Sequence, residues 1–409
     1  MTKVADQKLS AEGERNFLWA KAHMGVLTAL ADRHARTKPL EGVKVGAALH
    51  VTKETSVLID ALLAAGADVR LAGANPLSTK DDIAAYLSTR TEVWAWKGQS
   101  PKEYKWCIDQ VLRSRPEQLI DDGGDLHVAA HLSHAKVVGG SEETTTGVVR
   151  LKALEAEGKL AYPVIAVNDA RTKHMFDNRY GTGQSTLDGI MRATALLLAG
   201  VKTVVVGYGW VGKGVAMRAR GMGARVIVVE VDPIKALEAH LDGFDVSSID
   251  AAASQGLLFI TTTGQKNVVP YEAIVKMKEG AILANAGHFD VEIDVKTLLS
   301  KAKVVKEVRP NVDEVTLPSG KRVYLIAKGR IANIVAGEGH PPEVMQMSFA
   351  NQLLAAIRVH SQHGKMQKKI YGVPDEIEDE VARAALKSMG VSIGSPTMEQ
   401  KEYAKSWKL

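Results

Sequence analysis

The sequence predicts an α/β protein that contains two doubly wound parallel-sheet domains and ends in helices. Three observations support this prediction. The chain has 409 residues, which at about 150 residues per domain is enough for two or three domains. Short apolar runs alternate with helical stretches, the pattern of β-α-β units in a parallel sheet. The same alternation begins a second time after residue 184.

The first series of apolar runs predicts five buried strands. They are expected at residues 43–51, 68–72, 92–96, 118–120 and 135–138. Helical stretches lie between them. Residues 78–81 read Ser-Thr-Lys-Asp, which suits a capping box that opens a helix running through Tyr86.

The second series starts with a helix at residues 186–199, which Gly200 is expected to end. Strands are expected at 202–206, 225–229, 257–260, 281–283, 303–308, 312–317 and 322–326. Pro318-Ser319-Gly320 separates the last two and is a hairpin signal. Two further amphipathic helices are predicted, one from Pro341-Pro342 to about His360 and one at 375–389.

Composition excludes several classes of protein. Hydrophobic residues make up 45% and charged residues 24% of the chain, which is ordinary for a globular protein and excludes disordered, collagenous and disulfide-rich chains. Cys107 is the only cysteine, so no internal disulfide can form, and a reducing compartment is expected.

Charge and hydropathy exclude further classes of protein. The net charge of +5 is spread along the chain, without the basic and aromatic stripe of nucleic-acid-binding proteins. The polar N-terminus is not a signal peptide, and no apolar run approaches the roughly 20 residues of a membrane span. We therefore expect a cytoplasmic protein that binds neither nucleic acid nor membrane.

A glycine-rich turn follows the predicted strand at 202–206. Gly207, Gly209 and Gly212 form a G-x-G-x-x-G motif between that strand and a helix. Such glycines permit the tight turn, the approach of a pyrophosphate and close helix packing. Glu230 ends the next strand, 18 residues after Gly212, where an acid accepts hydrogen bonds from a ribose and repels a 2′-phosphate. The second domain is therefore predicted to be a Rossmann domain that binds NAD rather than NADP.

Polar clusters follow three strands of the first domain. They read LHVTKET (49–55), DDGGD (121–125) and SEETTTG (141–147). Each alone is more often a helix N-cap with acids near the helix dipole. Because ligands of open α/β sheets bind outside the carboxyl ends of strands, the three together favour one shared cleft.

Two other groups of polar residues leave alternatives open. Lys173 and Asp177 lie near the domain junction and are four residues apart, a spacing that also suits a surface ion pair on a helix. His288 and His340 each lie in a loop next to glycine, and a single loop histidine is more often structural than catalytic.

Together these motifs resemble the S-adenosyl-L-homocysteine hydrolase family. Similar strings run in that family's order from Leu49 to Gln352, and SEETTTGV and GHFDVEID are highly specific to it. The matching strings are LHVTKET, NPLSTKDD, WAWKGQSPKEYKWCI, DDGGDL, SEETTTGV, VNDARTKHMFDNRYG, GYGWVGKG, ARVIVVEVDP, TTTG, NAGHFDVEID, GRIANIVAGEGHP and MSFANQ.

The resemblance implies an enzyme that reversibly converts S-adenosyl-L-homocysteine and water into adenosine and L-homocysteine. One tightly bound NAD per subunit would oxidise the 3′-hydroxyl and later reduce the ketone. The ketone acidifies the C4′ proton, a base removes that proton, homocysteine leaves and water adds. No metal is expected.

The resemblance also implies roles for individual residues. The catalytic set is His50, Asp122, Asn168, Lys173, Asp177 and His288. The substrate-binding set is Thr52, Glu54, Glu143, Lys173, Asp177 and His340. The NAD-binding set is Thr144, Thr145, Thr146, Asn178, Gly207, Gly209, Gly212, Glu230, Asn285, Gly287 and Asn333. Either His50 or Asp122 would be the C4′ base, and burial is expected to lower the pKa of Lys173.

The expected organisation follows from the same resemblance. A substrate-binding domain would cover residues 1–180, completed by a return segment at 340–372. The Rossmann NAD-binding domain would cover 181–339, and a helical tail 373–409. The chain ends at Ser406-Trp407-Lys408-Leu409, without the family's usual C-terminal Lys and Tyr tail, as in short archaeal-type members. A small-molecule substrate and a homotetramer are expected.

Three alternatives remain from the sequence. Some short relatives favour the inosyl substrate, so an S-inosyl-homocysteine hydrolase is possible, although Glu54 at the purine edge favours the adenosyl compound. An NAD-dependent 2-hydroxyacid dehydrogenase also pairs two α/β domains, but SEETTTGV has no role there. A non-catalytic NAD-binding relative would lack a catalytic group, whereas the full catalytic set is present.

Overall fold

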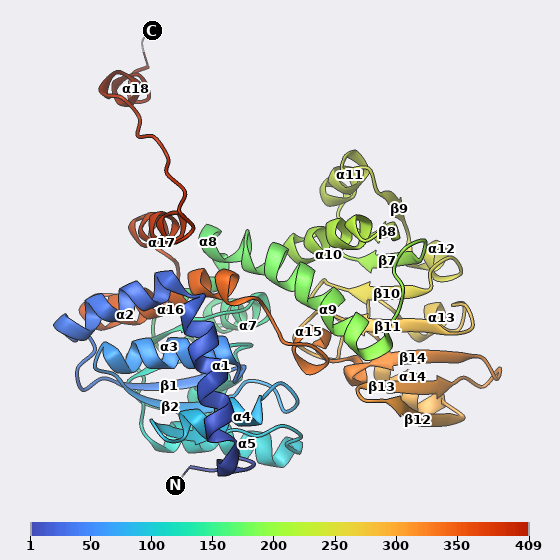
Figure 1. Ribbon diagram of the computed structural model, residues 1–409, viewed down its shortest axis with the longest axis horizontal. Coiled ribbons are helices and arrows are strands. Elements are labelled where there is room, and N and C mark those ends of the chain that lie inside the picture. The colour runs from blue at the N-terminus through green and yellow to red at the C-terminus, as the bar shows by residue number, and fades with distance from the viewer. Residues whose placement is uncertain (1, 408–409) are drawn as a thin grey trace.

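The chain builds two sheets, each flanked by helices, and ends in a short helical tail (Figure 1). The computed structural model describes residues 2–407. The last two positions of the expected shortened tail, Lys408 and Leu409, lie outside the described residues.

Within residues 2–407, the first sheet has seven strands in the order β15-β6-β5-β4-β1-β2-β3, and all neighbouring pairs are parallel. The strands are β1 (Lys44–Leu49), β2 (Asp68–Gly73), β3 (Glu92–Trp94), β4 (Gln118–Asp121), β5 (Gly139–Glu142), β6 (Val164–Ala166) and β15 (Ile370–Gly372).

Helices pack on both faces of this sheet. Successive side chains of β1 point to opposite faces, so Val45, Ala47 and Leu49 enter one hydrophobic cluster while Ala48 enters another. The first cluster includes α1 (Ser10–Ala22), α2 (Gly25–Thr37), α3 (Lys53–Ala64), α4 (Asp81–Leu87), α16 (Pro342–Ser361) and α17 (Asp375–Ser388), and the second includes α5 (Pro101–Arg113), α6 (Asp125–Leu132) and α7 (Thr145–Ala156).

The second sheet is mixed. Its order is β12-β13-β14-β11-β10-β7-β8-β9, with an antiparallel meander at the β12 edge and parallel pairs elsewhere. The strands are β7 (Lys202–Val206), β8 (Arg225–Val229), β9 (Asp245–Ser247), β10 (Leu258–Thr261), β11 (Ala281–Asn285), β12 (Val304–Arg309), β13 (Val312–Thr316) and β14 (Arg322–Ile326). The predicted hairpin is confirmed by the antiparallel pairing of β13 with β14.

Two hydrophobic clusters also enclose the second sheet. One includes α9 (Thr182–Thr194), α10 (Trp210–Gly221), α11 (Pro233–Leu241) and α15 (Ala332–Val335), and the other includes α12 (Ile249–Ala253), α13 (Tyr271–Ile274) and α14 (Val295–Lys301). Short helices connect the two sheets: η2 (Val167–Asp169), α8 (Arg171–His174) and the π-helical turn η3 (Asp177–Gly181).

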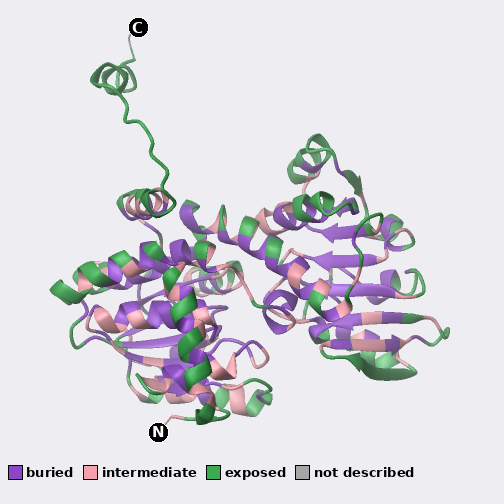
Figure 2. Cartoon of the chain, viewed as in Figure 1, coloured by how far each residue is buried: buried purple, intermediate pink, exposed green. Residues whose placement is uncertain are grey.

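The chain returns to the first sheet after building the second. The long helix α16 packs in the first sheet's hydrophobic cluster, and β15 then pairs in parallel with β6. Beyond α17, the segment that leads to α18 (Met398–Tyr403) projects from the molecule and is exposed throughout (Figure 2).

Both sheets contain a topological switch point, the place where ligands bind in open α/β sheets. In the first sheet, β1 and β4 are neighbours, and His50 and Asp122 follow their carboxyl ends. In the second, β7 and β10 are neighbours, and Gly207 and Thr262 follow them. His50, Asp122 and Thr262 line one cavity, so the two switch points meet there.

Three local predictions were wrong. The strand expected at 135–138 lies instead at β5, four residues later. The helix expected at 186–199 is α9, which ends at Thr194 with Ala195 in the left-handed conformation. The helix after residue 80 has Lys80, not Ser78, at its N-cap position, and makes no side-chain capping hydrogen bond. Ser78 has a different partner in the site.

Candidate active site

A cavity lies where the carboxyl ends of the two sheets meet. The predicted site residues that line it are His50, Thr52, Glu54, Asp122, Glu143, Thr144, Thr145, Thr146, Asn168, Lys173, Asp177, Asn178, Gly287, His288, Asn333 and His340. The sequence motifs, which span residues 50 to 340, therefore converge on one place.

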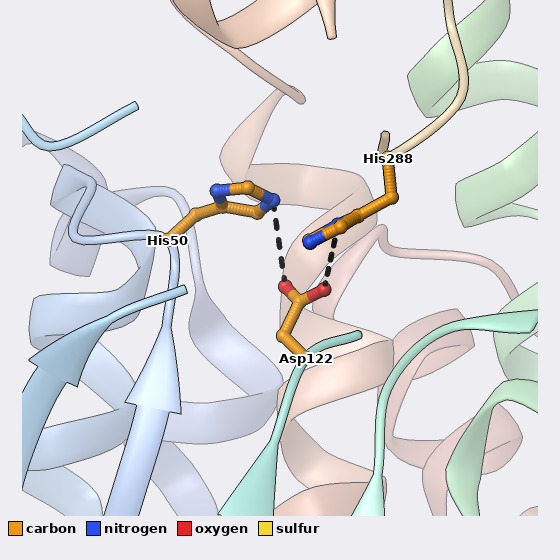
Figure 3. A group of neighbouring side chains, drawn as sticks. All are labelled: His50, Asp122 and His288. Atoms are coloured by element: carbon orange, nitrogen blue, oxygen red, sulfur yellow. Dashed lines mark ion pairs between the residues drawn. The ribbon is translucent and has the colours of Figure 1, made fainter. Parts of the chain in front are cut away.

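His50, Asp122 and His288 form an acid–base cluster at one side of this cavity (Figure 3). The Asp122 carboxylate lies between the two rings, with Oδ2 at 3.8 Å from Nε2 of His50 and Oδ1 at 3.6 Å from Nδ1 of His288. The ring centroids are 5.3 Å apart. His50 and Asp122 come from the first sheet, whereas His288 comes from the loop after β11 of the second.

Burial decides the charge states in this cluster. It lowers the pKa of His50 to about 3 and that of His288 to about 4, so both rings are neutral near pH 7. Burial also raises the pKa of Asp122, which His288 and Lys173 partly oppose. Neither ring nitrogen of His288 has a hydrogen-bond partner within residues 2–407, so the ring is free to exchange a proton with a bound ligand.

Ser78 orients His50. Its Oγ lies 2.6 Å from Nδ1 of His50, and both side chains are buried. With Nδ1 occupied, Nε2 faces Asp122, which fixes the nitrogen that is available for proton transfer. This function of Ser78 could not be predicted from the sequence, where its only visible signal was the apparent capping box.

Lys173 and Asp177 form a second charged group, deeper between the two sheets. Nζ of Lys173 lies 3.4 Å from Oδ2 of Asp177 and 3.8 Å from Oε1 of Glu143. It donates to Oδ1 of Asn178 at 2.9 Å and to Oδ1 of Asn168 at 3.4 Å. Lys173 is 3% exposed and Asp177 is 2% exposed, so the alternative of a surface ion pair is excluded.

The expected pKa shift of Lys173 has the wrong sign. Burial alone lowers the pKa of Lys173, but the carboxylates of Asp177 and Glu143 outweigh it and raise the pKa. Lys173 is therefore a cation in the ligand-free site. Burial would raise the pKa of Asp177, but Lys173 and His340 hold it well below its usual range, so Asp177 is ionised.

Glu143 lies beside this pair, and Gln352 of α16 holds its side chain by a hydrogen bond. Its Oε2 accepts a hydrogen bond from Nε2 of Gln352 at 2.5 Å, and Oε1 of Gln352 accepts one from the Ser141 hydroxyl at 2.5 Å. Burial raises the pKa of Glu143 to about 8, against the opposing effect of Lys173. Oε1 of Glu143 makes no hydrogen bond in the described part of the chain, so it is available to a ligand hydroxyl.

His340 is placed next to Asp177. Its Nδ1 lies 2.7 Å from Oδ1 of Asp177, and its Nε2 lies 3.1 Å from both Oγ1 of Thr182 and Nδ2 of Asn333. The resemblance assigned this ring to the adenine. In the structure both of its nitrogens have protein partners and the ring also lines the cavity, so its contact with adenine stays a prediction.

The glycine turn fits a dinucleotide. Gly207 has a φ of +103°, and a side chain there would meet Thr263 at 2.7 Å. A Cβ on Gly212 would lie 2.0 Å from the carbonyl oxygen of Gly207, whereas one on Gly209 would meet nothing within 4 Å. Gly209 caps α10 without any side-chain hydrogen bond, so the N–H groups at this helix end remain free for a pyrophosphate.

Glu230 lies at the end of β8, beside this turn. Its Oε2 accepts a hydrogen bond from the N–H of Tyr208 at 2.8 Å, and its Oε1 accepts from those of Val231 at 2.7 Å and Asp232 at 3.0 Å. These donors fix the carboxylate against the glycine turn, where a ribose would approach. The residues present therefore fit NAD.

Asn285 is among the predicted NAD-binding residues. It is fully buried, and its amide donates to the carbonyl oxygens of Gly287, Phe289 and Gly329 while its oxygen accepts from Thr261 and from the N–H of Gly287. Asn285 thus supports the loop that carries His288, and its contact with NAD stays a prediction.

Two buried carboxylates behind the site were also missed. Oε1 of Glu142 accepts from the N–H groups of Gly123 and Thr144 and from the Thr144 hydroxyl, at 2.9, 2.9 and 2.8 Å. Glu292 similarly accepts from Thr263 and Gly264. Both lie inside expected motifs, SEETTTGV and GHFDVEID, but neither lines the cavity.

No helix within residues 2–407 combines the length and the apolar character that a membrane span requires.

Comparisons with known proteins point to the same family that the sequence motifs resemble. Residues 1–137 match the model of the S-adenosyl-L-homocysteine hydrolase family, and residues 178–339 match that of its NAD binding domain. An adenosylhomocysteinase from Aeropyrum pernix is 55% identical, and one from Sulfurisphaera tokodaii is 54% identical, each match covering 99% of both chains.

An S-inosyl-L-homocysteine hydrolase from Methanocaldococcus jannaschii is 50% identical, over 100% of this chain and 99% of that protein. Matches to both family models and to relatives of the same length lead to one conclusion. The chain belongs to the S-adenosyl-L-homocysteine hydrolase family.

Proposed function

We propose that this protein catalyses the reversible hydrolysis of S-adenosyl-L-homocysteine to adenosine and L-homocysteine, with bound NAD as cofactor. One observation carries the proposal. The Lys173, Asp177 and Glu143 group and the His50, Asp122 and His288 cluster line the same cavity. A hydroxyl-binding group and an acid–base cluster in one cavity suit a reaction that combines oxidation at C3′ with elimination at C5′.

NAD supplies the chemistry of hydride removal from C3′ and its return. Lys173 and Asp177 bind the 3′-hydroxyl, and Glu143, through its unpaired Oε1, binds a ribose hydroxyl. The Lys173–Asp177 pair handles the 3′-hydroxyl proton, and the cationic Lys173 stabilises negative charge that develops on that oxygen. Asn168 and Asn178 orient the ammonium group.

The acid–base cluster serves C4′ and C5′. Asp122, working with His50, takes the acidic C4′ proton, and the pKa of Asp122 is raised by burial, which makes the carboxylate a stronger base. His288, whose nitrogens have no partner within the described chain, assists departure of homocysteine and addition of water. Thr52 and Glu54 recognise the purine.

In this proposal the nucleobase of the substrate is adenine. An ionised carboxylate only accepts hydrogen bonds, and adenine offers its amine as a donor. The relatives named adenosylhomocysteinase at 54% and 55% identity support the same choice over the inosyl alternative.

The remaining expectations belong to this proposal as well. Residues 1–180 with the return segment 340–372 form the substrate-binding domain, 181–339 the NAD-binding domain, and 373–409 the tail. The enzyme is a cytoplasmic homotetramer with one NAD per subunit. Size-exclusion chromatography with light scattering, together with the nucleotide content per chain, tests the assembly and the stoichiometry.

The test of the reaction uses the purified protein as it is isolated. Denaturation should release NAD, and addition of S-adenosyl-L-homocysteine should release free thiol from homocysteine without stoichiometric accumulation of NADH. Sustained NADH formation in proportion to turnover would instead identify a dehydrogenase, and absence of both thiol and NADH would support a non-catalytic protein.

A further inference from the structure

Glu54 lines the cavity from the first turn of α3, and a lysine lies next to its carboxylate. Its side chain is almost fully buried. The lysine is its chain neighbour, with Nζ of Lys53 at 3.2 Å from Oε1 of Glu54. The carboxylate thus borders the ligand cavity and is also in contact with an ammonium group.

Lys53 itself does not line the ligand cavity. It lines a neighbouring pocket that it shares with Glu338, Arg192 and His340. Its Nζ lies 3.4 Å from Oε2 of Glu338, whose side chain is 58% exposed. Any effect of Lys53 on a bound purine must therefore pass through Glu54.

The charge of Glu54 depends on two opposing effects on its pKa. Burial raises the pKa of Glu54, because the ionised form loses hydration, and the ammonium group of Lys53 is the largest effect that opposes the rise. The helix N-terminus adds a smaller contribution in the same direction as Lys53. Without Lys53, the neutral form of Glu54 becomes more favourable.

The two forms of Glu54 differ in how strongly they discriminate between purines. As a carboxylate it only accepts, which suits the exocyclic amine of adenine and leaves the oxygen at C6 of hypoxanthine facing a charge without a donor. As a neutral acid it also donates, so it can pair with either base: it accepts from the amine and donates to N1 of adenine, or donates to the C6 oxygen and accepts from N1–H of hypoxanthine. The ionised form therefore selects adenine and the neutral form does not, because a base left with an unpaired polar group is bound less well.

We propose that Lys53 is a specificity-determining residue: its ammonium group holds Glu54 as the carboxylate that selects an aminopurine over an oxopurine. The inference rests on the proposed function, since it requires a purine nucleoside thioether in this cavity. Lys53 touches no substrate, so it is a positioning residue that acts through Glu54.

Lys80 provides a matched control. Its Nζ donates to the carbonyl oxygens of Gly337 at 2.8 Å and Ile334 at 3.5 Å, so it ties the first sheet to the same segment that Lys53 reaches through Glu338. No contact joins Lys80 to Glu54 among the interactions of the described residues. Lys80→Met therefore removes a neighbouring lysine and its interdomain contact without touching the purine-selecting carboxylate.

The experiment measures kcat/KM for S-adenosyl-homocysteine and for S-inosyl-homocysteine at one pH and salt concentration. Wild type, Lys53→Met, Lys53→Arg and Lys80→Met are compared. The adenosyl-to-inosyl ratio should fall about tenfold or more in Lys53→Met, as expected when a charge-assisted interaction is lost. The ratio should be retained in Lys53→Arg and should change less than about twofold in Lys80→Met.

Inhibition by adenosine and inosine gives a second readout if a variant turns over slowly. The same shift should appear in the ratio of their inhibition constants, since both nucleosides present only the purine difference. Glu338→Gln removes the competing partner of Lys53 and should leave the ratio unchanged or raise it.

An unchanged ratio in folded, NAD-containing Lys53→Met would overturn the inference, as would an equal fall in Lys80→Met. Failure of the proposed function looks different, because wild type would then release homocysteine from neither thioether.

Discussion

Nζ of Lys173 lies 3.4 Å from Oδ2 of Asp177, with both side chains almost fully buried between the two sheets. This contact makes Lys173 a cation in the ligand-free site, because Asp177 and Glu143 together overcome the effect of burial on its pKa. For Lys173 to accept the proton of a 3′-hydroxyl, it must first lose its own.

The first prediction concerns that lysine. Lys173→Met keeps the length of the side chain and removes the ammonium group, so reduction of bound NAD after addition of adenosine should slow at least about a hundredfold. Stopped-flow absorbance of reduced nicotinamide measures the rate. Lys152→Met is the matched control, since Lys152 pairs with Asp169 at the exposed surface. A wild-type rate in Lys173→Met would remove Lys173 from the redox step.

The second prediction concerns the buried carboxyl group of Glu142, whose Oε1 accepts hydrogen bonds from Gly123 and Thr144. Burial raises the pKa of Glu142 well above its usual range, and Glu142→Gln keeps an acceptor oxygen for the three donors, so it is a close substitute. Glu142→Ala leaves three donors from Gly123 and Thr144 without their acceptor and should lower the free energy of unfolding by roughly 2–4 kcal/mol. Urea denaturation checks both variants. Equal destabilisation by Gln and Ala would show that Glu142 needs its charge.

The third prediction concerns pH and Glu143. Burial raises the pKa of Glu143 to about 8, whereas an unfolded glutamate titrates near about 4.3. Between these values the folded state binds more protons, so the free energy of unfolding falls as pH rises, by at most about 1.4 kcal/mol per pH unit from this group. Glu143→Gln should lose that contribution.

The stability of Glu143→Gln relative to wild type should therefore increase from pH 5 to pH 8. Chemical denaturation at four pH values measures the difference. A difference that is constant across this range would mean that Glu143 is already ionised at pH 5.

The fourth prediction concerns the cofactor. Glu230→Gln keeps the shape of the side chain but replaces one acceptor oxygen by an amide, which faces either a ribose hydroxyl or the N–H groups of the turn. NAD affinity should fall about ten- to a hundredfold. Titration of NAD-depleted protein, followed by calorimetry, gives the dissociation constant. Unchanged affinity would exclude Glu230 from the cofactor site.

Much of the second sheet could be predicted from sequence. The strands at 202–206, 225–229 and 322–326 were predicted with the bounds that the structure has. Each starts with Lys or Arg; the first two continue in β-branched residues, and the third continues Val-Tyr-Leu-Ile. Burial and strand propensity therefore point to the same element.

The strand β5 could not be predicted in the same way. Its sequence, Gly-Gly-Ser-Glu, contains no strong strand former, whereas residues 135–138 do. The reason lies in its neighbours: a Cβ on Gly140 would come within 2.6 Å of the Leu119 carbonyl oxygen, and one on Gly139 within 2.6 Å of the Val359 side chain. Close packing against another strand and α16 excludes side chains here, and local propensity has no information about that.

The site likewise has features that could be predicted from the sequence and features that could not. The convergence of the polar motifs could be predicted from the strand order, and the residues that line the cavity agree with it. The link from Ser78 to His50 joins residues 28 positions apart, and the sign of the pKa shift of Lys173 depends on the distances to two carboxylates. Neither follows from a motif, because both are properties of three-dimensional separation.

The contact between Thr182 and His340 has a mechanical consequence. The chain crosses between the two sheets twice, once near each of these residues, and their side chains touch at 3.1 Å. Any change in how the two sheets are set against each other must therefore bend the chain at these two adjoining crossings. Asp177, paired with His340, lies at the crossings, whereas His50 and His288 are carried by different sheets.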